Sequence, residues 1–369
     1  MNLFVLLFVF VFGIIGSYSS KFSEKNLFWL FVIVLAIIIG GRSISVPDTD
    51  QYLEFYQLTL SSSILDIPLY SYEIGFQLLT KILKLITNGS SFFYFGIIVL
   101  INSYFLFKSF SCFTDQSYPS KKSSGTLINQ IKLQEFLLLY FSYWGLYYTG
   151  IVLRAGIAMS ILIYLSTLLC SPYISLKKWS AIFLLAIISC SFHITALLGI
   201  IALIIFYISK KMTMRSYLLL FLLICIILFG KVSFWIVDML DRNMPMIFSL
   251  IEDTDFAKLQ AYSNIDASIK ISFRFLFCLL IGLFFIICKR MPLYYYKYLN
   301  VYIVGLFLGA LFSAIEAFSR IMDFFVIYSF ILISMRLSTI NSFKIRFSIM
   351  FSIVLIQLLL SIELLLVYE

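Results

Sequence analysis

The sequence predicts an all-α, polytopic integral membrane protein of about 12 transmembrane helices, since a helix that crosses the hydrocarbon needs about 20 apolar residues. Three observations lead to this fold class. Of the 369 residues, 62% are hydrophobic and only 12% are charged, which excludes a chain surrounded by water. Apolar stretches that approach the length of a bilayer crossing recur along the whole chain. Lysine and arginine gather in every second connection between these stretches, as they do in short cytoplasmic loops.

The expected spans follow one another with mostly short polar connections, so a single transmembrane domain is predicted over residues 1–369. The first apolar stretch lacks a basic n-region and a small-residue cleavage site, and we interpret it as a retained span rather than a signal peptide. The spans are expected at residues 2–18, 27–41, 92–110, 134–151, 155–171, 179–192, 194–209, 216–235, 271–288, 298–315, 320–336 and 347–367.

The charged residues assign the sides of the membrane. The connection 111–133 contains Lys121 and Lys122 and is predicted to be a cytoplasmic loop. The connections 42–91 and 236–270 hold most of the acidic residues and are predicted to be periplasmic. The net charge of +9 is therefore a topology signal that suits anionic lipid headgroups. No helix-length basic stripe interleaved with aromatics suggests nucleic acid.

Residues 72–87 do not fit a span, because polar side chains recur there at helical spacing against apolar ones. Such an amphipathic pattern is typical of a helix at a membrane interface. A crossing at this point would also place every later basic loop on the wrong side of the membrane. We therefore expect an interfacial helix within the periplasmic loop 42–91.

Ionisable residues lie at three places where one apolar stretch meets the next, and we call each of these places a tip. The three tips contain Arg154, then His193, then the group Glu316, Arg320 and Asp323. Charge at bilayer depth is costly and is therefore usually functional. We expect the three tips to share one side of the membrane and to form the active site. His193 equally fits a structural interhelical hydrogen bond, and Arg320 equally fits an internal ion pair with Glu316 or Asp323.

An ordered set of short motifs runs along the chain: Gly41-Arg42, Pro47-Asp48-Thr49 with Tyr52 and Tyr56, Glu73-x-Gly75-Phe76, Leu153-Arg154-Ala155-Gly156-Ile157-Ala158, Phe192-His193 before Thr195-Ala196, and Arg320. In order and spacing, this set resembles the Wzy/EpsG-type polysaccharide polymerases of the bacterial inner membrane. At Ala155 the chain departs from the glutamine that such proteins commonly place beside the arginine, which loosens the expected hydrogen bonding at this tip.

The resemblance implies a GT-C-like, multi-pass glycosyltransferase of the inner membrane whose active site faces the periplasm. Its donor is a glycan linked to undecaprenyl pyrophosphate, and the growing glycan is moved to the non-reducing end of a new lipid-linked repeat unit. A separate chain-length co-polymerase is an expected partner, and neither a cofactor nor a nucleic acid is expected.

The departing pyrophosphate gathers negative charge, which fixed arginines in a dry cavity stabilise. Arg154 and Arg320 are the candidates, with Arg42, Arg242 and Arg274 as further contacts. The acceptor hydroxyl needs a base or a hydrogen-bond acceptor. His193 is favoured for that role by its place at a recessed tip, and the other available groups are Asp48, Glu73, Glu316 and Asp323.

The motif Asp48-Thr49-Asp50 looks like the D-x-D that holds a divalent cation in many glycosyltransferases, but Pro47-Asp48 equally suits the N-cap of a helix over residues 51–58. No metal site is predicted, because arginines can replace the cation. Outward-facing tyrosines are expected to stack on sugars, among them Tyr52, Tyr56, Tyr147 and Tyr148.

Two rival functions share the many-span architecture. A lipid-linked oligosaccharide flippase or secondary transporter is expected to show internal repeats or broken helices, and no convincing repeat is present. An O-antigen ligase shares the lipid donor and differs only in its acceptor, so the family pattern alone separates it from a polymerase.

Overall fold

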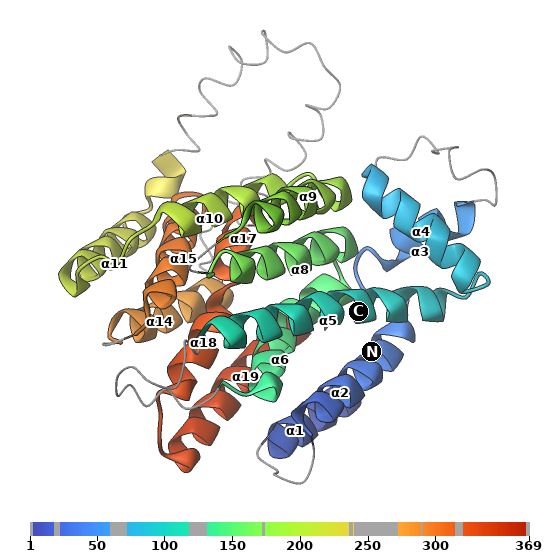
Figure 1. Ribbon diagram of the computed structural model, residues 1–369, viewed down its shortest axis with the longest axis horizontal. Coiled ribbons are helices and arrows are strands. Elements are labelled where there is room, and N and C mark those ends of the chain that lie inside the picture. Colours follow the sequence, from blue (N-terminus) through green and yellow to red (C-terminus); the bar gives the residue numbers. More distant parts are fainter. Residues whose placement is uncertain are drawn as a thin grey trace. The chain divides into compact units, whose positions relative to one another are not determined.

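A computed structural model describes residues 3–17, 23–59, 72–117, 131–171, 174–235, 239, 272–288, 291–313 and 320–366. The predicted all-α class is confirmed, since the elements in these ranges are helices and none is a strand (Figure 1). Each expected span contains a helix. The rest of the chain lies outside the described residues, which includes most of the predicted loop 236–270 and the central part of the predicted loop 111–133.

Three of the described helices are long and apolar enough to cross a membrane: Ser91–Thr114, Arg320–Ser338 and Phe343–Ile362. Shorter apolar helices, of 10 to 17 residues, lie at Val5–Gly16, Leu153–Leu168, Ala196–Ile208, Met214–Phe229 and Phe273–Ile286. An apolar helix of this kind is stable only where its outer face avoids water. The structure therefore supports a membrane protein, and the number of crossings stays a prediction.

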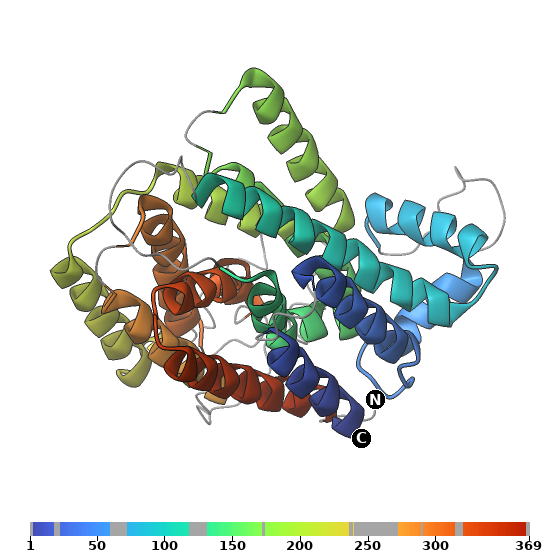
Figure 2. The same cartoon turned by 60° about the horizontal axis from the view of Figure 1, so that its bottom comes forward.

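The chain divides into two compact units, residues 1–203 with 333–369 and residues 204–332. In the first unit α5 packs against both α2 and α8, and α8 packs against α9 (Figure 2). The main helices of this unit are α1 (Leu3–Ser17), α2 (Glu24–Gly40), α5 (Ser91–Ser117), α6 (Leu133–Tyr140), α8 (Leu153–Leu168), α9 (Leu176–Phe192) and α19 (Phe343–Leu366).

The expected span 134–151 is helical but contains a π-helical turn. The turn, Phe141–Gly145, joins α6 to α7 (Leu146–Gly150) and packs against α19. Ser142 Oγ within it donates a hydrogen bond of 2.5 Å to Gln357 Oε1 on α19. At the start of α6, the buried Glu135 carboxylate forms an ion pair with Arg346 of α19. These contacts fix α6 and α7 against the last helix, because buried polar groups need partners.

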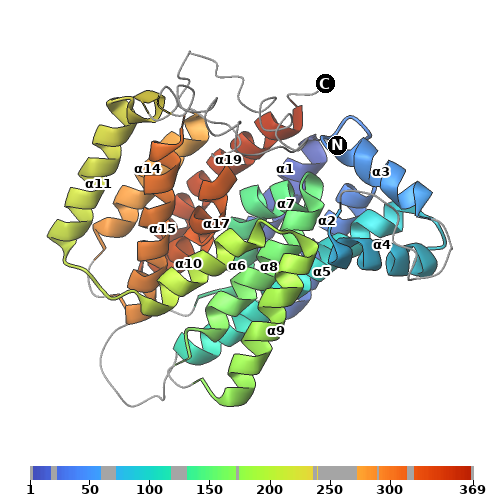
Figure 3. The same cartoon turned by 90° about the horizontal axis from the view of Figure 1, so that it is seen from above.

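Two short helices, α3 (Thr49–Leu58) and α4 (Ile74–Ile86), contact each other, and α4 also contacts α5 and α9 (Figure 3). The predicted amphipathic helix 72–87 is therefore present as a helix. Between α9 and α10 (Ala196–Ile208) the chain leaves the helical conformation at His193–Thr195, where a turn was predicted.

The second unit is organised around α15 (Leu293–Leu311), which contacts α11 (Met214–Phe229), α14 (Phe273–Ile286) and α17 (Asp323–Val326). The 3-10 turn η2 (Arg320–Met322) leads into α17, and α18 (Ser329–Ser338) follows. Buried polar groups on α15 find partners on neighbouring helices. The Tyr302 hydroxyl donates to the Cys278 carbonyl oxygen at 2.6 Å, and the Tyr217 hydroxyl donates to Asn300 Oδ1 at 2.7 Å.

Candidate functional site

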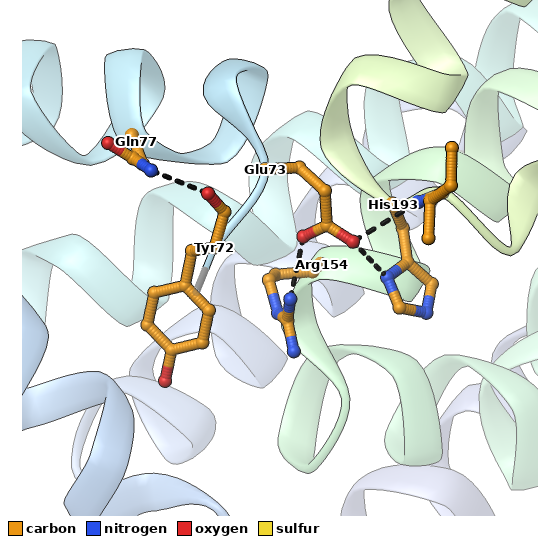
Figure 4. Close-up of polar contacts among 6 residues, drawn as sticks. Tyr72, Glu73, Gln77, Arg154 and His193 are labelled. Atoms are coloured by element: carbon orange, nitrogen blue, oxygen red, sulfur yellow. Dashed lines mark hydrogen bonds and ion pairs between the residues drawn. The ribbon is translucent and has the colours of Figure 1, made fainter. Parts of the chain in front are cut away.

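The carboxylate of Glu73 joins Arg154 to His193 (Figure 4). Its Oε2 atom lies 2.6 Å from Arg154 Nη1, and its Oε1 atom lies 2.8 Å from His193 Nδ1. The same Oε1 accepts the backbone N–H of Ile194 at 3.1 Å. One carboxylate thus binds a fixed cation, an imidazole and a backbone donor. The side chains of Glu73, Arg154 and His193 form what we call the Glu73 cluster. Each of them is about a fifth exposed, so the cluster is sheltered yet open to a ligand.

Local backbone geometry brings Glu73 to this position. Glu73 is the extended residue just before α4, and its carbonyl oxygen accepts the first helical hydrogen bond from Gln77 N. Two residues later, Gly75 packs against the last turn of α9, where an added Cβ would lie 2.7 Å from the Ser191 carbonyl oxygen. Only glycine permits this close approach. The start of α4 therefore lies directly beside the end of α9, where His193 follows.

Arg154 is the second residue of α8, and α8 reaches this place through a tight turn after α7. Gly156 makes the turn possible, because a Cβ there would collide with the backbone of Tyr148. The Arg154 guanidinium lies 4.4 Å from the centre of the Tyr72 ring. A cation in the first turn of a helix is opposed by the helix dipole. This end of α8 is therefore strongly positive and attracts anions, beginning with Glu73.

The electrostatics of the cluster keep Glu73 ionised. Burial raises the pKa of its carboxyl group, but the hydrogen bond with His193, the charge of Arg154 and the Ile194 N–H outweigh burial and lower the pKa to about 2. An ionised carboxylate only accepts hydrogen bonds. The proton between Glu73 and His193 therefore belongs to His193 Nδ1. In the neutral imidazole, Nε2 is then the nitrogen that carries the free lone pair.

Arg42 lies close to α7 rather than in the Glu73 cluster. Its Nη1 donates to the Gly150 carbonyl oxygen at 2.7 Å, and its guanidinium stacks 3.6 Å above the Phe95 ring. Burial lowers the pKa of Arg42 to about 10, which still leaves the side chain charged at neutral pH. A cation at a helix C-terminus is favourable. In this structure Arg42 holds the end of α7 in place, just before the turn that leads to Arg154.

The outer tyrosines are more buried than the sequence predicted. Tyr52 and Tyr56 are each 2% exposed, and Tyr148 is also buried, whereas Tyr147 is half-buried. Tyr52 packs edge-on against Phe76, and the Tyr56 hydroxyl pairs with Thr87 Oγ1 at 2.5 Å. Tyr52 and Tyr56 are buried because α3 folds its aromatic face onto its neighbours, and Tyr148 of α7 is buried as well. Stacking of these rings on sugars stays a prediction.

Asp48 takes the N-cap position of α3, as one reading of the sequence predicted. Its backbone is left-handed, with a φ of 59°, and its side chain makes no capping hydrogen bond to α3. A non-glycine residue in this conformation is under strain, which is frequent near functional sites. Among the described residues, no three His, Cys, Asp or Glu side chains come together as a metal site.

The candidates of the third tip lie in the second unit. Asp323 is buried and forms its ion pair with Arg274, not with Arg320 as the sequence allowed. Arg320 opens the 3-10 turn and is exposed. Arg242 and Glu316 lie outside the described residues. The structure thus joins two of the three predicted tips, those of Arg154 and His193, through Glu73.

Sequence reasoning named Glu73 but missed its central role, and it missed Tyr72 altogether. Tyr72 shields one face of Arg154, and its carbonyl oxygen accepts a hydrogen bond of 2.5 Å from Gln77 Nε2 (Figure 4). Burial raises the pKa of the Tyr72 phenol to about 12, so it stays neutral. The short spacing Glu73-x-Gly75 was the available signal, since a glycine in the first turn of an amphipathic helix indicates a close contact there.

Comparisons with known proteins identify one family. The profile of the EpsG family matches residues 25–368, which is nearly the whole chain and includes every residue of the Glu73 cluster. No curated protein matches the sequence. No solved structure matches it either.

Proposed function

The chain belongs to the EpsG family, and from this premise we propose that it is a polysaccharide polymerase acting as a glycosyltransferase on lipid-linked repeat units. The donor is a glycan on undecaprenyl pyrophosphate, and the acceptor is the non-reducing end of a new lipid-linked unit. The observation that carries the proposal is the Arg154–Glu73–His193 cluster, which holds a fixed cation beside an oriented imidazole.

In this reaction an acceptor hydroxyl attacks the anomeric carbon of the donor. The new glycosidic C–O bond forms as the bond between the sugar and the diphosphate breaks, and the lipid diphosphate leaves. The hydroxyl proton passes to His193 Nε2, the nitrogen that does not face Glu73. Glu73 holds the ring in the required tautomer and stabilises the imidazolium that forms. A positioned base of this kind contributes roughly 10²- to 10⁴-fold to a rate.

The proposed role of Arg154 is to bind the diphosphate. Its Nη1 is engaged by Glu73, and about a fifth of the side chain stays exposed. The guanidinium is therefore open on one side to a phosphate oxygen, with which it forms a charge-assisted hydrogen bond. Arginine and the positive end of α8 then act on the same anion, which is the usual way that a leaving diphosphate is stabilised.

Several residues keep the roles that the sequence predicted. Arg320 and Asp48 remain proposed catalytic residues. The proposed substrate contacts are Arg42, Tyr52, Tyr56, Arg242, Arg274, Glu316 and Asp323. We further propose a GT-C-like protein of about 12 spans in the bacterial inner membrane, with its site facing the periplasm and with a chain-length co-polymerase as a partner.

In vitro turnover tests the proposal. Purified protein in nanodiscs would be incubated with synthetic lipid-linked repeat units and the products separated by chain length. Polymer of two or more repeats supports a polymerase, whereas transfer only to a lipid A-core acceptor would identify a ligase. No transfer to either acceptor would reject the glycosyltransferase assignment. A chelator arm tests the Asp48-Thr49-Asp50 motif, because full activity in EDTA excludes an essential divalent cation.

A further inference from the structure

The helix α4 exposes apolar side chains and buries polar ones, the reverse of what a helix in water does. Its exposed side chains are all apolar, with exposures from 38% to 68%, while its polar residues Gln77, Thr80 and Lys81 are buried. A helix on a water-facing surface buries its apolar stripe and exposes its polar one. The exposed residues of α4 are Ile74, Leu78, Ile82, Leu85 and Ile86. Something apolar therefore covers this face in the working protein.

The neighbouring helix α3 serves as an internal comparison. Apart from Leu58, the exposed residues of α3 are polar, namely Asp50, Gln51, Glu54 and Gln57. The two helices contact each other, yet one presents polar side chains and the other presents only Leu and Ile. The charged Lys84 of α4 turns toward α3, where its Nζ donates to the Gln57 carbonyl oxygen at 2.7 Å. The border between a polar and an apolar medium therefore runs between these two helices.

The apolar face of α4 continues onto α9. The two helices meet at Gly75 and Ser191. Ile187 lies one helical turn before Ser191 on the same face of α9 and is exposed, as is Leu184. The stripe on α4 follows the same spacing, at residues 74, 78, 82 and 85. A single apolar surface thus extends from a predicted span onto a helix of 13 residues, which at about 20 Å is too short to cross a bilayer.

We infer that the exposed face of α4, at Ile74, Leu78, Ile82, Leu85 and Ile86, is embedded in the hydrocarbon of the membrane leaflet beside the Glu73 cluster. The occupant is lipid rather than a second protein, because the surface is continuous with the apolar face of α9 and carries no charge. Glu73 directly precedes α4, so this anchoring sets the depth of its carboxylate at the boundary between hydrocarbon and headgroups. Resting on the proposed function, that depth suits a diphosphate whose lipid tail stays in the membrane.

Spin labels measure the medium around α4 directly. Leu78→Cys and Ile82→Cys would be introduced singly into a variant whose six native cysteines are replaced by serine, then labelled and reconstituted in nanodiscs. Glu54→Cys on the exposed side of α3 is the matched control. Frequent collision of the spin label with molecular oxygen indicates that the label lies in hydrocarbon. Frequent collision with a water-soluble nickel chelate indicates that the label lies in water. Circular dichroism and gel filtration confirm that each labelled variant is folded.

We expect labels 78 and 82 to collide at least several-fold more with oxygen relative to nickel chelate than label 54 does. Nickel accessibility at 78 and 82 equal to that at 54 would place α4 in water and overturn the inference. Low accessibility to both reagents would reveal a covering protein and would overturn it equally. The readout does not depend on glycosyl transfer, so failure of the proposed function leaves this result unaffected.

Discussion

Gly75 lies against Ser191 so closely that an added Cβ would stand 2.7 Å from the Ser191 carbonyl oxygen and 2.8 Å from its carbonyl carbon. The obstacle is backbone, which cannot turn aside as a flexible side chain could. This contact joins the helix that Glu73 precedes to the helix that ends at His193. The distance between the two proposed catalytic partners therefore depends on the absence of one methyl group.

Gly75→Ala is expected to lower kcat about 100-fold, because a displacement of about 1 Å at a reacting group costs on that order. Turnover of lipid-linked repeat units measures the effect. Gly41→Ala is the matched control, since a Cβ there meets its nearest neighbour at 3.6 Å, an ordinary contact. Equal activity of the two variants would show that α4 can shift without disturbing the site.

Glu73→Gln tests the charge of the carboxylate through the pH dependence of stability. The folded protein lowers the pKa of Glu73 from its ordinary 4.5 to about 2, so the unfolded chain binds this proton first as pH falls. Wild type should therefore exceed Glu73→Gln in Tm at pH 5. That margin should shrink as pH falls from about 4.5 toward 2. A margin that stays constant over this window would contradict the lowered pKa.

Arg154→Lys separates positive charge from the geometry of the guanidinium. Lysine keeps a cation beside Glu73 but loses the planar fork that binds two oxygens and stacks on Tyr72. We expect a Tm near that of wild type and a kcat/KM lower by about 10²-fold, the scale of one lost transition-state donor. Arg154→Ala removes the positive charge as well as the guanidinium, so both Tm and kcat/KM should fall. Wild-type turnover of the lysine variant would reduce Arg154 to a simple counter-ion of Glu73.

Arg42→Met tests the interpretation of Arg42 as a brace for α7. Methionine has a comparable apolar stem but cannot donate to the Gly150 carbonyl oxygen, which then stays unsatisfied. We expect destabilisation of about 1 to 3 kcal/mol, measured by denaturant or thermal unfolding. If Arg42 serves only as this brace, KM for the donor should change little, because its contacts are with Gly150 and Phe95 rather than with the Glu73 cluster. A large rise in KM at unchanged stability would instead support direct substrate contact.

Sequence reasoning located the helices well because each expected span is an apolar run bounded by polar residues. It could not find the π-helical turn at Phe141–Gly145, since nearly every residue from 133 to 150 is buried and the few polar ones form no stripe at helical spacing. It also offered Asp323 as one possible ion-pair partner of Arg320, three positions away, whereas Asp323 pairs with Arg274 of another helix. Short-range spacing alone does not predict such pairs.

The Glu73 cluster likewise depends on contacts between residues that are far apart in the sequence. Arg154 and His193 were singled out by their cost at bilayer depth, but their common partner lies 81 and 120 residues away in sequence. Only the packing of α4 on α9 brings that partner to them. The burial of Tyr52 was missed for a related reason, because the possible helix over residues 51–58 gave no indication that it would pack on α4.

His193→Asn distinguishes a catalytic histidine from a structural one. The asparagine amide nitrogen lies near the place of Nδ1, so it can keep the hydrogen bond to Glu73, which measures 2.8 Å in the wild type. Asparagine has no group at the place of Nε2 and cannot accept the proton of the acceptor hydroxyl. If His193 is the base, kcat should fall by about 10²- to 10⁴-fold while Tm stays close to wild type.

His193→Ala completes this test, because alanine removes the hydrogen bond to Glu73 as well as the base. A structural histidine predicts that asparagine restores both activity and stability relative to alanine. A catalytic histidine predicts that asparagine restores stability alone, since the Glu73 carboxylate is again satisfied but the proton has no acceptor. Measuring kcat and Tm for both variants in the same nanodiscs therefore separates the two roles, even if the alanine variant is poorly folded.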